Sequence, residues 1–226
     1  MTNETNTFPL IQTKLHRPRV NSELIERPRL LAYLNERPER PFTLISAPAG
    51  YGKTTLLAQW LDQTPYQEAW LSLDENDNSL IEFLSYFVAA VQTFFPNGLS
   101  TTHSLLATAQ TPPVNHLTTT LINELTDLPE EFLLVLDDYH LITDKEIQQL
   151  VSTLMQHAPP PLHLVITSRK DPPFSLTRPR AAQQLVEIRM NDLRFTSDEV
   201  QSYLKLCLGA NISPEIVTVL AERTEG

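Results

Sequence analysis

The residues with the clearest chemical potential lie in one segment, Ala47 to Thr54, which reads APAGYGKT. It holds two of the chain's five glycines, Gly50 and Gly52, and glycine lets backbone amides turn inward around an anion without a clash from Cβ. Lys53 could reach the β- and γ-phosphates of a nucleotide, and the Thr54 hydroxyl could bind Mg²⁺. The segment therefore predicts a phosphate-binding loop, although alanine stands where the strict pattern has its first glycine.

A second group of candidate residues follows a short apolar run, Leu133 to Leu136. Asp137 ends this run and could hold Mg²⁺ directly or through water, and Asp138 could accept a proton from an attacking water. Arg169 ends another apolar run and could stabilise charge on a transferred phosphate. The alternatives are two acids that cap a strand exit and an ordinary surface arginine.

A sheet must bring these residues together, and the chain alternates strand-like and helix-like segments. Five apolar runs predict strands at 42–46, 69–73, 132–138, 162–169 and 184–190. Helical spacing, and capping boxes at Thr143 with Glu146 and at Thr196 with Glu199, predict helices at 25–34, 54–61, 79–95, 117–128, 143–157, 196–208 and from 214 onward, with a loop at 97–114. This alternation predicts an α/β fold of three layers around a parallel five-stranded sheet.

The distance along the chain between the two candidate groups adds a topological expectation. Roughly eighty residues separate Lys53 from Asp137, and they contain one complete strand and at least one helix. Because both residues must lie near one phosphate and its metal ion, a further strand must be inserted between their strands or lie outside them. This arrangement resembles the additional-strand division of P-loop ATPases, whose members often carry a second catalytic acid.

Composition narrows the class of protein. The chain has 226 residues, with 17 Lys and Arg against 27 Asp and Glu, a net charge of −10. From Thr54 to Asp144 there is no Lys or Arg, but there are thirteen carboxylates. We expect no direct contact with nucleic acid, because that needs clustered basic residues. We also expect no membrane span, no secretory signal and a cytoplasmic location, since Cys207 is the single cysteine.

The same signals divide the chain into three parts. Residues 1–22 lack periodicity and are expected to form an extended arm. Residues 23–195 contain the strands and both candidate groups, and so form the expected P-loop nucleotide-binding domain. Residues 196–226 are expected to begin a truncated helical subdomain.

Short motifs along nearly the whole chain resemble a known family. They are Thr13-Lys14-Leu15 with Arg17-Pro18, Ile25 to Leu31, Ala47 to Thr55, Trp70 to Asp74, Leu136 to His140, Thr167 to Arg169, Asp192 to Phe195 and Arg223 to Gly226. In this order they resemble the MalT-like, ATP-dependent transcriptional activators of the LuxR type. These belong to the signal transduction ATPases with numerous domains (STAND), relatives of the NB-ARC and NACHT modules.

The resemblance implies a nucleotide switch. ADP would hold a closed, monomeric form, and ATP would favour an open form that self-associates and activates transcription. Slow, Mg²⁺-dependent hydrolysis would reset the switch. Family members continue into winged-helix, sensor and helix-turn-helix parts, so this chain would lack the DNA-binding domain.

The resemblance also assigns roles to residues. It implies that Arg27 contacts the base and sugar of ATP or ADP, that Thr54 and Asp137 hold Mg²⁺, that Asp138 acts on the attacking water and that Arg169 senses the γ-phosphate. The phosphate contacts would come from Ala49, Gly50, Tyr51, Gly52, Lys53, Thr54 and Thr55.

Two other functions fit the same loop. A small-molecule kinase would need arginines over the phosphates, which Arg178 and Arg180 could supply. A catalytically silent, nucleotide-dependent interaction module could instead offer the apolar helix at 79–95 to a partner.

Overall fold

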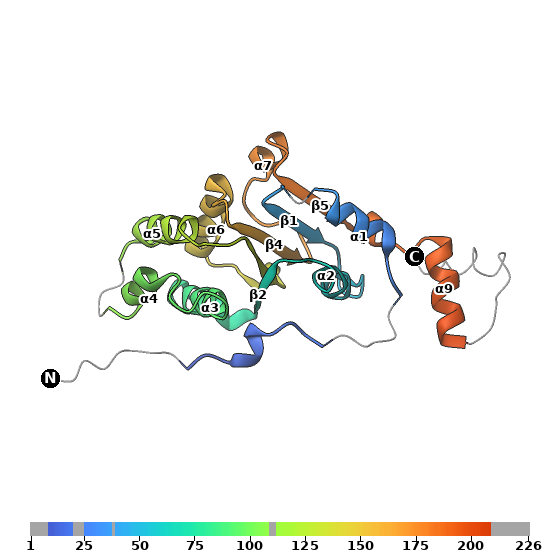
Figure 1. Cartoon of the computed structure of the whole chain (residues 1–226), viewed down its shortest axis with the longest axis horizontal. Coiled ribbons are helices and arrows are strands. Elements are labelled where there is room, and N and C mark those ends of the chain that lie inside the picture. The colour runs from blue at the N-terminus through green and yellow to red at the C-terminus, as the bar shows by residue number, and fades with distance from the viewer. Residues whose placement is uncertain (1–8, 20–24, 38, 109–111, 209–226) are drawn as a thin grey trace.

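A parallel sheet forms the centre of the molecule. The computed structural model describes residues 9–19, 25–37, 39–108 and 112–208. Within them, five parallel strands are ordered β2-β3-β4-β1-β5 (Figure 1). Their bounds are β1 Phe42–Ser46, β2 Gln67–Ser72, β3 Phe132–Asp137, β4 Leu162–Ser168 and β5 Leu185–Arg189. The predicted fold class is confirmed, and β4 is the strand inserted between β1 and β3.

The strands are apolar because both faces of the sheet are covered. All five residues of β1 and all six of β3 are buried, as expected for a parallel sheet between two helical layers. Side chains alternate along a strand, so Leu134 and Leu136 join the hydrophobic cluster on one face, and Leu133 and Val135 join the cluster on the other.

Helices form the two outer layers (Figure 1). Helices α3 to α6 contribute to the first cluster, and α1, α2 and α8 to the second. The helices are α1 Pro28–Asn35, α2 Lys53–Leu61, α3 Leu80–Gln92, α4 Ser100–Leu106, α5 Val114–Thr126, α6 Lys145–His157, α7 Thr177–Ala181, α8 Met190–Leu193 and α9 Ser197–Leu208, with 3₁₀ turns η1 Gln12–Leu15, η2 Glu75–Asp77 and η3 Tyr139–Leu141.

Helix α3 belongs to the core. Its side chains Phe83, Leu84, Phe87 and Val91 are fully buried in the first cluster. The apolar face predicted at 79–95 is therefore covered by this chain itself. None of the helices in the described ranges is long and apolar enough to span a lipid bilayer.

The loop expected at 97–114 is partly wrong, because α4 lies within it. The helix begins where the Glu124 carboxylate, from α5, accepts hydrogen bonds from the amides of Thr101 and Thr102 at 2.7 and 2.8 Å. These amides would otherwise lack partners at a helix start. A cap supplied from more than twenty residues away leaves no local signal in the sequence.

Of the two expected capping boxes, one is confirmed. The Thr196 amide donates to Glu199, and Thr196 Oγ1 accepts from the Glu199 amide. At α6 the prediction is wrong by one residue. Asp144 caps that helix by accepting from the amides of Glu146 and Ile147, because a carboxylate is a strong acceptor for amides at a helix start.

The expected division into an arm at 1–22, a nucleotide-binding domain at 23–195 and a helical subdomain at 196–226 stays a prediction. The described part of the arm includes the turn η1, so it is not uniformly extended. The helix expected from 214 and the motif at 223–226 lie outside the described residues.

A histidine in β4 gives the fold a pH dependence. His163 Nε2 is 2.9 Å from Thr43 Oγ1, and its ring meets that of Trp60 edge-on. Burial lowers the pKa of His163 to about 4. Between about pH 6.5 and about pH 4 the unfolded chain binds a proton here and the folded chain does not. Stability is therefore lost as the pH falls through this window.

We expect His163→Gln to remove this loss. Going from about pH 7.5 to about pH 4.5, wild type should lose about 2 kcal/mol more unfolding free energy than the variant. Urea unfolding of both proteins at the two pH values measures the difference. Equal losses would show that His163 does not carry the effect.

Candidate functional site

The loop between β1 and α2 has the conformation that its glycines allow. Gly50 and Gly52 have φ values of 86° and 73°, in the left-handed region that favours glycine. A Cβ at either position would meet no atom within 4 Å, so the backbone conformation, not crowding, requires glycine. Helix α2 begins at Lys53 and directs its free amides and positive dipole end at the loop.

Lys53 is held at this loop. Its side chain is buried, and Nζ donates to the carbonyls of Ala47 and Pro48 at 2.9 and 3.1 Å. Burial lowers the pKa of Lys53, and the charge of Asp138 partly opposes that shift. The ammonium is therefore placed at the loop before any phosphate arrives.

The structure brings the two predicted metal ligands together across 83 positions of sequence. Thr54 Oγ1 lies 3.4 and 3.5 Å from the carboxylate oxygens of Asp137. Asp137 is buried, and burial raises its pKa although Thr167 Oγ1 donates a short hydrogen bond to it. A neighbouring cation would favour the charged form of this carboxylate.

These ligands suit Mg²⁺. In the described residues, no group of three or more His, Cys, Asp or Glu side chains converges as a site made by protein alone would. Mg²⁺ in nucleotide enzymes is held by one or two protein oxygens together with substrate phosphates and waters. The hydroxyl of Thr54 and the carboxylate of Asp137 fit that donor set.

Asp138 lies in a different environment from its neighbour. Its side chain is 42% exposed, whereas residue Asp137 is only 5% exposed. Its backbone is left-handed, with φ 59°, and its amide donates to Thr167 Oγ1 at 3.0 Å. One acid is therefore enclosed beside Thr54, and the other is open to a reacting water.

Two further residues belong to this site and were not among the predicted ones. Thr167 is fully buried and binds both aspartates through its hydroxyl. The His140 side chain is 10% exposed, and its Nδ1 lies 3.6 Å from Asp138 Oδ1 without a hydrogen-bond partner among the described residues. Burial lowers the pKa of His140. Both residues lie in motifs visible in the sequence, but their partners depend on the fold.

Arg169 follows β4 directly and is exposed. Its charge lowers the pKa of Lys53 and of His140, in addition to the effect of their burial. Its charge is therefore felt at the loop, and its role as a sensor of the γ-phosphate stays a prediction.

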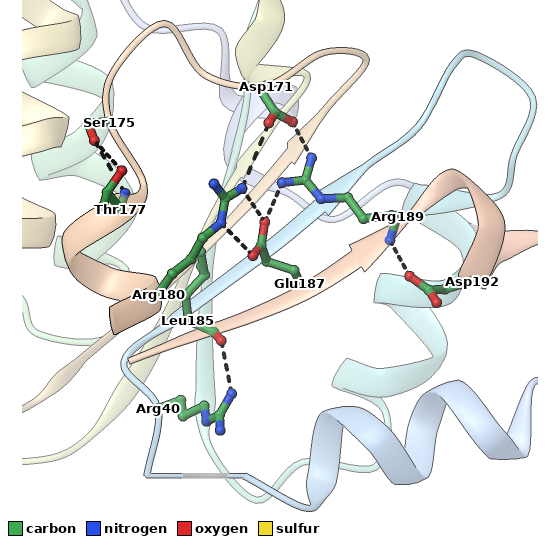
Figure 2. A network of polar contacts seen from close by, with 9 residues as sticks. All are labelled: Arg40, Asp171, Ser175, Thr177, Arg180, Leu185, Glu187, Arg189 and Asp192. Atoms are coloured by element: carbon green, nitrogen blue, oxygen red, sulfur yellow. Dashed lines mark hydrogen bonds and ion pairs between the residues drawn. The ribbon is translucent and has the colours of Figure 1, made fainter. Parts of the chain in front are cut away.

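An ion-pair ring fixes the segment after Arg169 (Figure 2). Asp171 pairs with Arg189 and Arg180, and both arginines also pair with Glu187 from β5. A closed network of four charges holds its members better than isolated surface pairs do. It ties the chain beyond Arg169 to the edge strand.

The contacts described for Arg27 are with the C-terminal part of the chain. Its guanidinium donates to the carbonyls of Leu193 and Arg194 at 2.7 and 3.1 Å and to Glu199 at 3.0 Å. It also lies 4.3 Å from the centre of the Phe195 ring. Its contact with the base and sugar of a nucleotide stays a prediction.

The remaining predicted residues lie in or beside the loop. Ala49 is exposed at its tip, and Tyr51 packs partly against the cluster under α1 and α2. Thr55 is in the first turn of α2. Their phosphate contacts also stay predictions.

Sequence comparison places the chain among known proteins. A family described as "AAA ATPase domain" matches residues 25–167. The HTH-type transcriptional regulator MalT of Yersinia pestis is 36% identical over 218 residues, which are 96% of this chain and 24% of that protein. MalT of Vibrio parahaemolyticus is 33% identical over 216 residues, with the same two coverages. The chain thus spans about a quarter of the length of these relatives.

Comparison with solved structures agrees on the fold. A STAND protein with a tetratricopeptide repeat sensor from Pyrococcus horikoshii superposes with a TM-score of 0.61 at 17% sequence identity. The match covers 93% of this chain and 29% of that one. At this identity the likeness concerns the arrangement of helices and strands.

Proposed function

Because the chain belongs to the AAA ATPase domain family, we propose that it is the nucleotide-dependent switch of a MalT-like transcriptional regulator. One observation carries the proposal: Lys53, Thr54, Asp137 and Asp138 converge on a loop whose glycines are both left-handed. The expected substrate is ATP, and the products are ADP and phosphate.

Each residue has a distinct role in this proposal. The amides from Gly50 to Thr54 and the Lys53 ammonium bind the phosphates. Thr54 and Asp137 hold Mg²⁺, which neutralises charge on the phosphate oxygens when it is bound. Asp138 orients the attacking water and accepts its proton.

Neighbouring side chains support that chemistry. His140 Nδ1, 3.6 Å from Asp138 Oδ1, is near enough to form a hydrogen bond with this carboxylate after a small movement of either side chain. Arg169 stabilises the negative charge on the transferred phosphate. Because Thr167 binds both aspartates, it sets their relative position.

The likeness to MalT supports the wider role. The relatives are named transcriptional regulators and are about four times as long as this chain. We propose that hydrolysis is slow, that it controls self-association of the whole protein, and that DNA is bound by parts outside this chain. The tract from Thr54 to Asp144, with thirteen carboxylates and no Lys or Arg, supports the absence of nucleic-acid contact here.

The two alternatives have less support. In a kinase Arg180 would reach over the phosphates, but it is held by Glu187 and Asp171. In a silent interaction module α3 would be a partner surface, but its apolar residues are in the core.

The proposed function predicts stabilisation by nucleotide. ADP or ATP with Mg²⁺ at about 100 times its dissociation constant should add about 2.7 kcal/mol to the unfolding free energy. For a chain of this size that raises the melting temperature by about 5–10 °C. Thermal unfolding followed by circular dichroism measures the shift. Adenosine, which lacks phosphates, is the control and should give almost none; an unchanged melt with both nucleotides contradicts the proposal.

A further inference from the structure

We propose that Lys14, in the N-terminal segment at residues 9–19, is a positioning residue for the turn that carries Asp138. This inference rests on the proposed function. The segment runs beside β2 and α3, and its turn η1 contacts both (Figure 1).

Lys14 forms the anchor of this segment. Its Nζ lies 2.7 and 2.9 Å from the carboxylate oxygens of Asp77 and 2.8 Å from Asp74. Asp77 is completely buried and Lys14 nearly so. Since the tract from Thr54 to Asp144 has no Lys or Arg of its own, the cation for this buried acid comes from the N-terminal segment.

The acids bound by Lys14 lie beside the end of β3. Ser72, the last residue of β2, is paired with Asp137, and the Leu73 amide donates to the Asp137 carbonyl at 3.0 Å. Asp77 closes the turn η2 immediately after this point by accepting from the Asp74 amide at 2.7 Å. The turns that follow β2 and β3 therefore leave the sheet side by side.

Asn78 connects these two turns. Its Nδ2 donates to the Leu141 carbonyl at 2.9 Å, and its Oδ1 accepts from the amides of Thr143 and Asp144 at 2.6 and 3.0 Å. The Leu141 amide in turn donates to the Asp138 carbonyl at 3.1 Å. Asp138 is thus bound directly by Thr167 and, through Leu141, indirectly by Asn78.

These contacts form a path from Lys14 through Asp77, Asn78 and Leu141 to Asp138. Without the cation, the buried Asp77 carboxylate is left as an unpaired charge and has to move toward water. This movement releases η2 and with it the hydrogen bonds of Asn78. The turn from Asp138 to Asp144 then loses the side chain that binds its Leu141 carbonyl and its last two amides, and the left-handed backbone of Asp138 is held less firmly.

Arg17 offers a matched control in the same segment. It donates to the Ala58 carbonyl at 3.2 Å and pairs with Asp62 at 2.6 Å and Glu68 at 3.5 Å. These contacts are with α2 and β2, not with η2. Replacing Arg17 loosens the segment and removes the same charge without breaking the path.

The test compares Lys14→Met with Arg17→Met in the whole chain. Hydrogen exchange without nucleotide should show the amides of Thr143 and Asp144 exchanging about tenfold faster in Lys14→Met and at the wild-type rate in Arg17→Met. The turnover number for ATP should fall about tenfold in Lys14→Met alone, with ADP affinity unchanged within about twofold.

Asn78→Ser is a second test variant, because it breaks the path without leaving a buried charge. It also covers the case in which Lys14→Met fails to fold. It should reproduce the faster exchange and slower turnover, and the double variant should be no slower than Lys14→Met.

The inference is overturned if Lys14→Met exchanges these amides, or turns over ATP, at the wild-type rate. If Lys14→Met is unfolded, the same result in Asn78→Ser overturns it. Equal effects of Arg17→Met overturn it too, because they indicate general loosening. A wild-type chain that binds no nucleotide overturns the proposed function, and the positioning role of Lys14 in hydrolysis with it. If wild type hydrolyses ATP and the variants do so at the same rate, only the positioning role of Lys14 is overturned.

Discussion

Replacing Lys53 by alanine is expected to weaken the binding of ADP and ATP by about 100-fold or more. The side chain is buried and its Nζ already lies at the loop, so little of its freedom is lost when phosphate binds. An anionic phosphate adds direct charge–charge attraction that the neutral carbonyls of Ala47 and Pro48 do not provide. Lys53→Ala removes the ammonium, so the variant loses this contribution to nucleotide affinity.

Isothermal titration of the variant with each nucleotide measures this loss. Lys145→Ala is the matched control, because it removes the same charge from an exposed position at the start of α6. It should bind as wild type does. If Lys53→Ala also binds as wild type does, the loop is not the phosphate site and the proposed function fails.

The loop could be predicted because its determinants are contiguous. Gly50 and Gly52 act through their backbone conformation, and Lys53 acts through its charge at the start of a helix. All these effects depend on residues next to one another in the sequence. Strand β3 was equally clear, since a strand buried on both faces must be apolar throughout. The requirement that Lys53 and Asp137 meet predicted that a strand is inserted between their strands or lies outside them, and the structure shows both, with β4 between and β2 outside.

The remaining features depend on partners far away in sequence. Helix α4 begins because Glu124 caps it. Thr167 binds both aspartates only because β4 lies beside β3. The contacts of Arg27 with residues 193–199 and of Lys14 with Asp77 join segments more than sixty residues apart. Such pairs leave no periodicity or local motif, so the sequence alone could not place them.

Replacing Asp138 by asparagine is expected to reduce ATP hydrolysis by about 100-fold or more while leaving nucleotide binding nearly intact. The substitution keeps the shape of the side chain and tolerates the left-handed backbone at this position. The hydrogen bond to Thr167 is made by the backbone amide and is also kept. What is lost is the ability to accept a proton from water.

Single-turnover hydrolysis measured beside ADP affinity separates chemistry from binding. Glu130 is an exposed acid elsewhere in the tract from Thr54 to Asp144. Glu130→Gln is therefore the control for lost charge and should hydrolyse ATP at the wild-type rate. Asp137→Asn should differ from Asp138→Asn, because loss of a metal ligand weakens Mg²⁺-ATP binding as well as turnover. If Asp138→Asn hydrolyses ATP normally, Asp138 is not the catalytic acid, and another group near the γ-phosphate must activate the water.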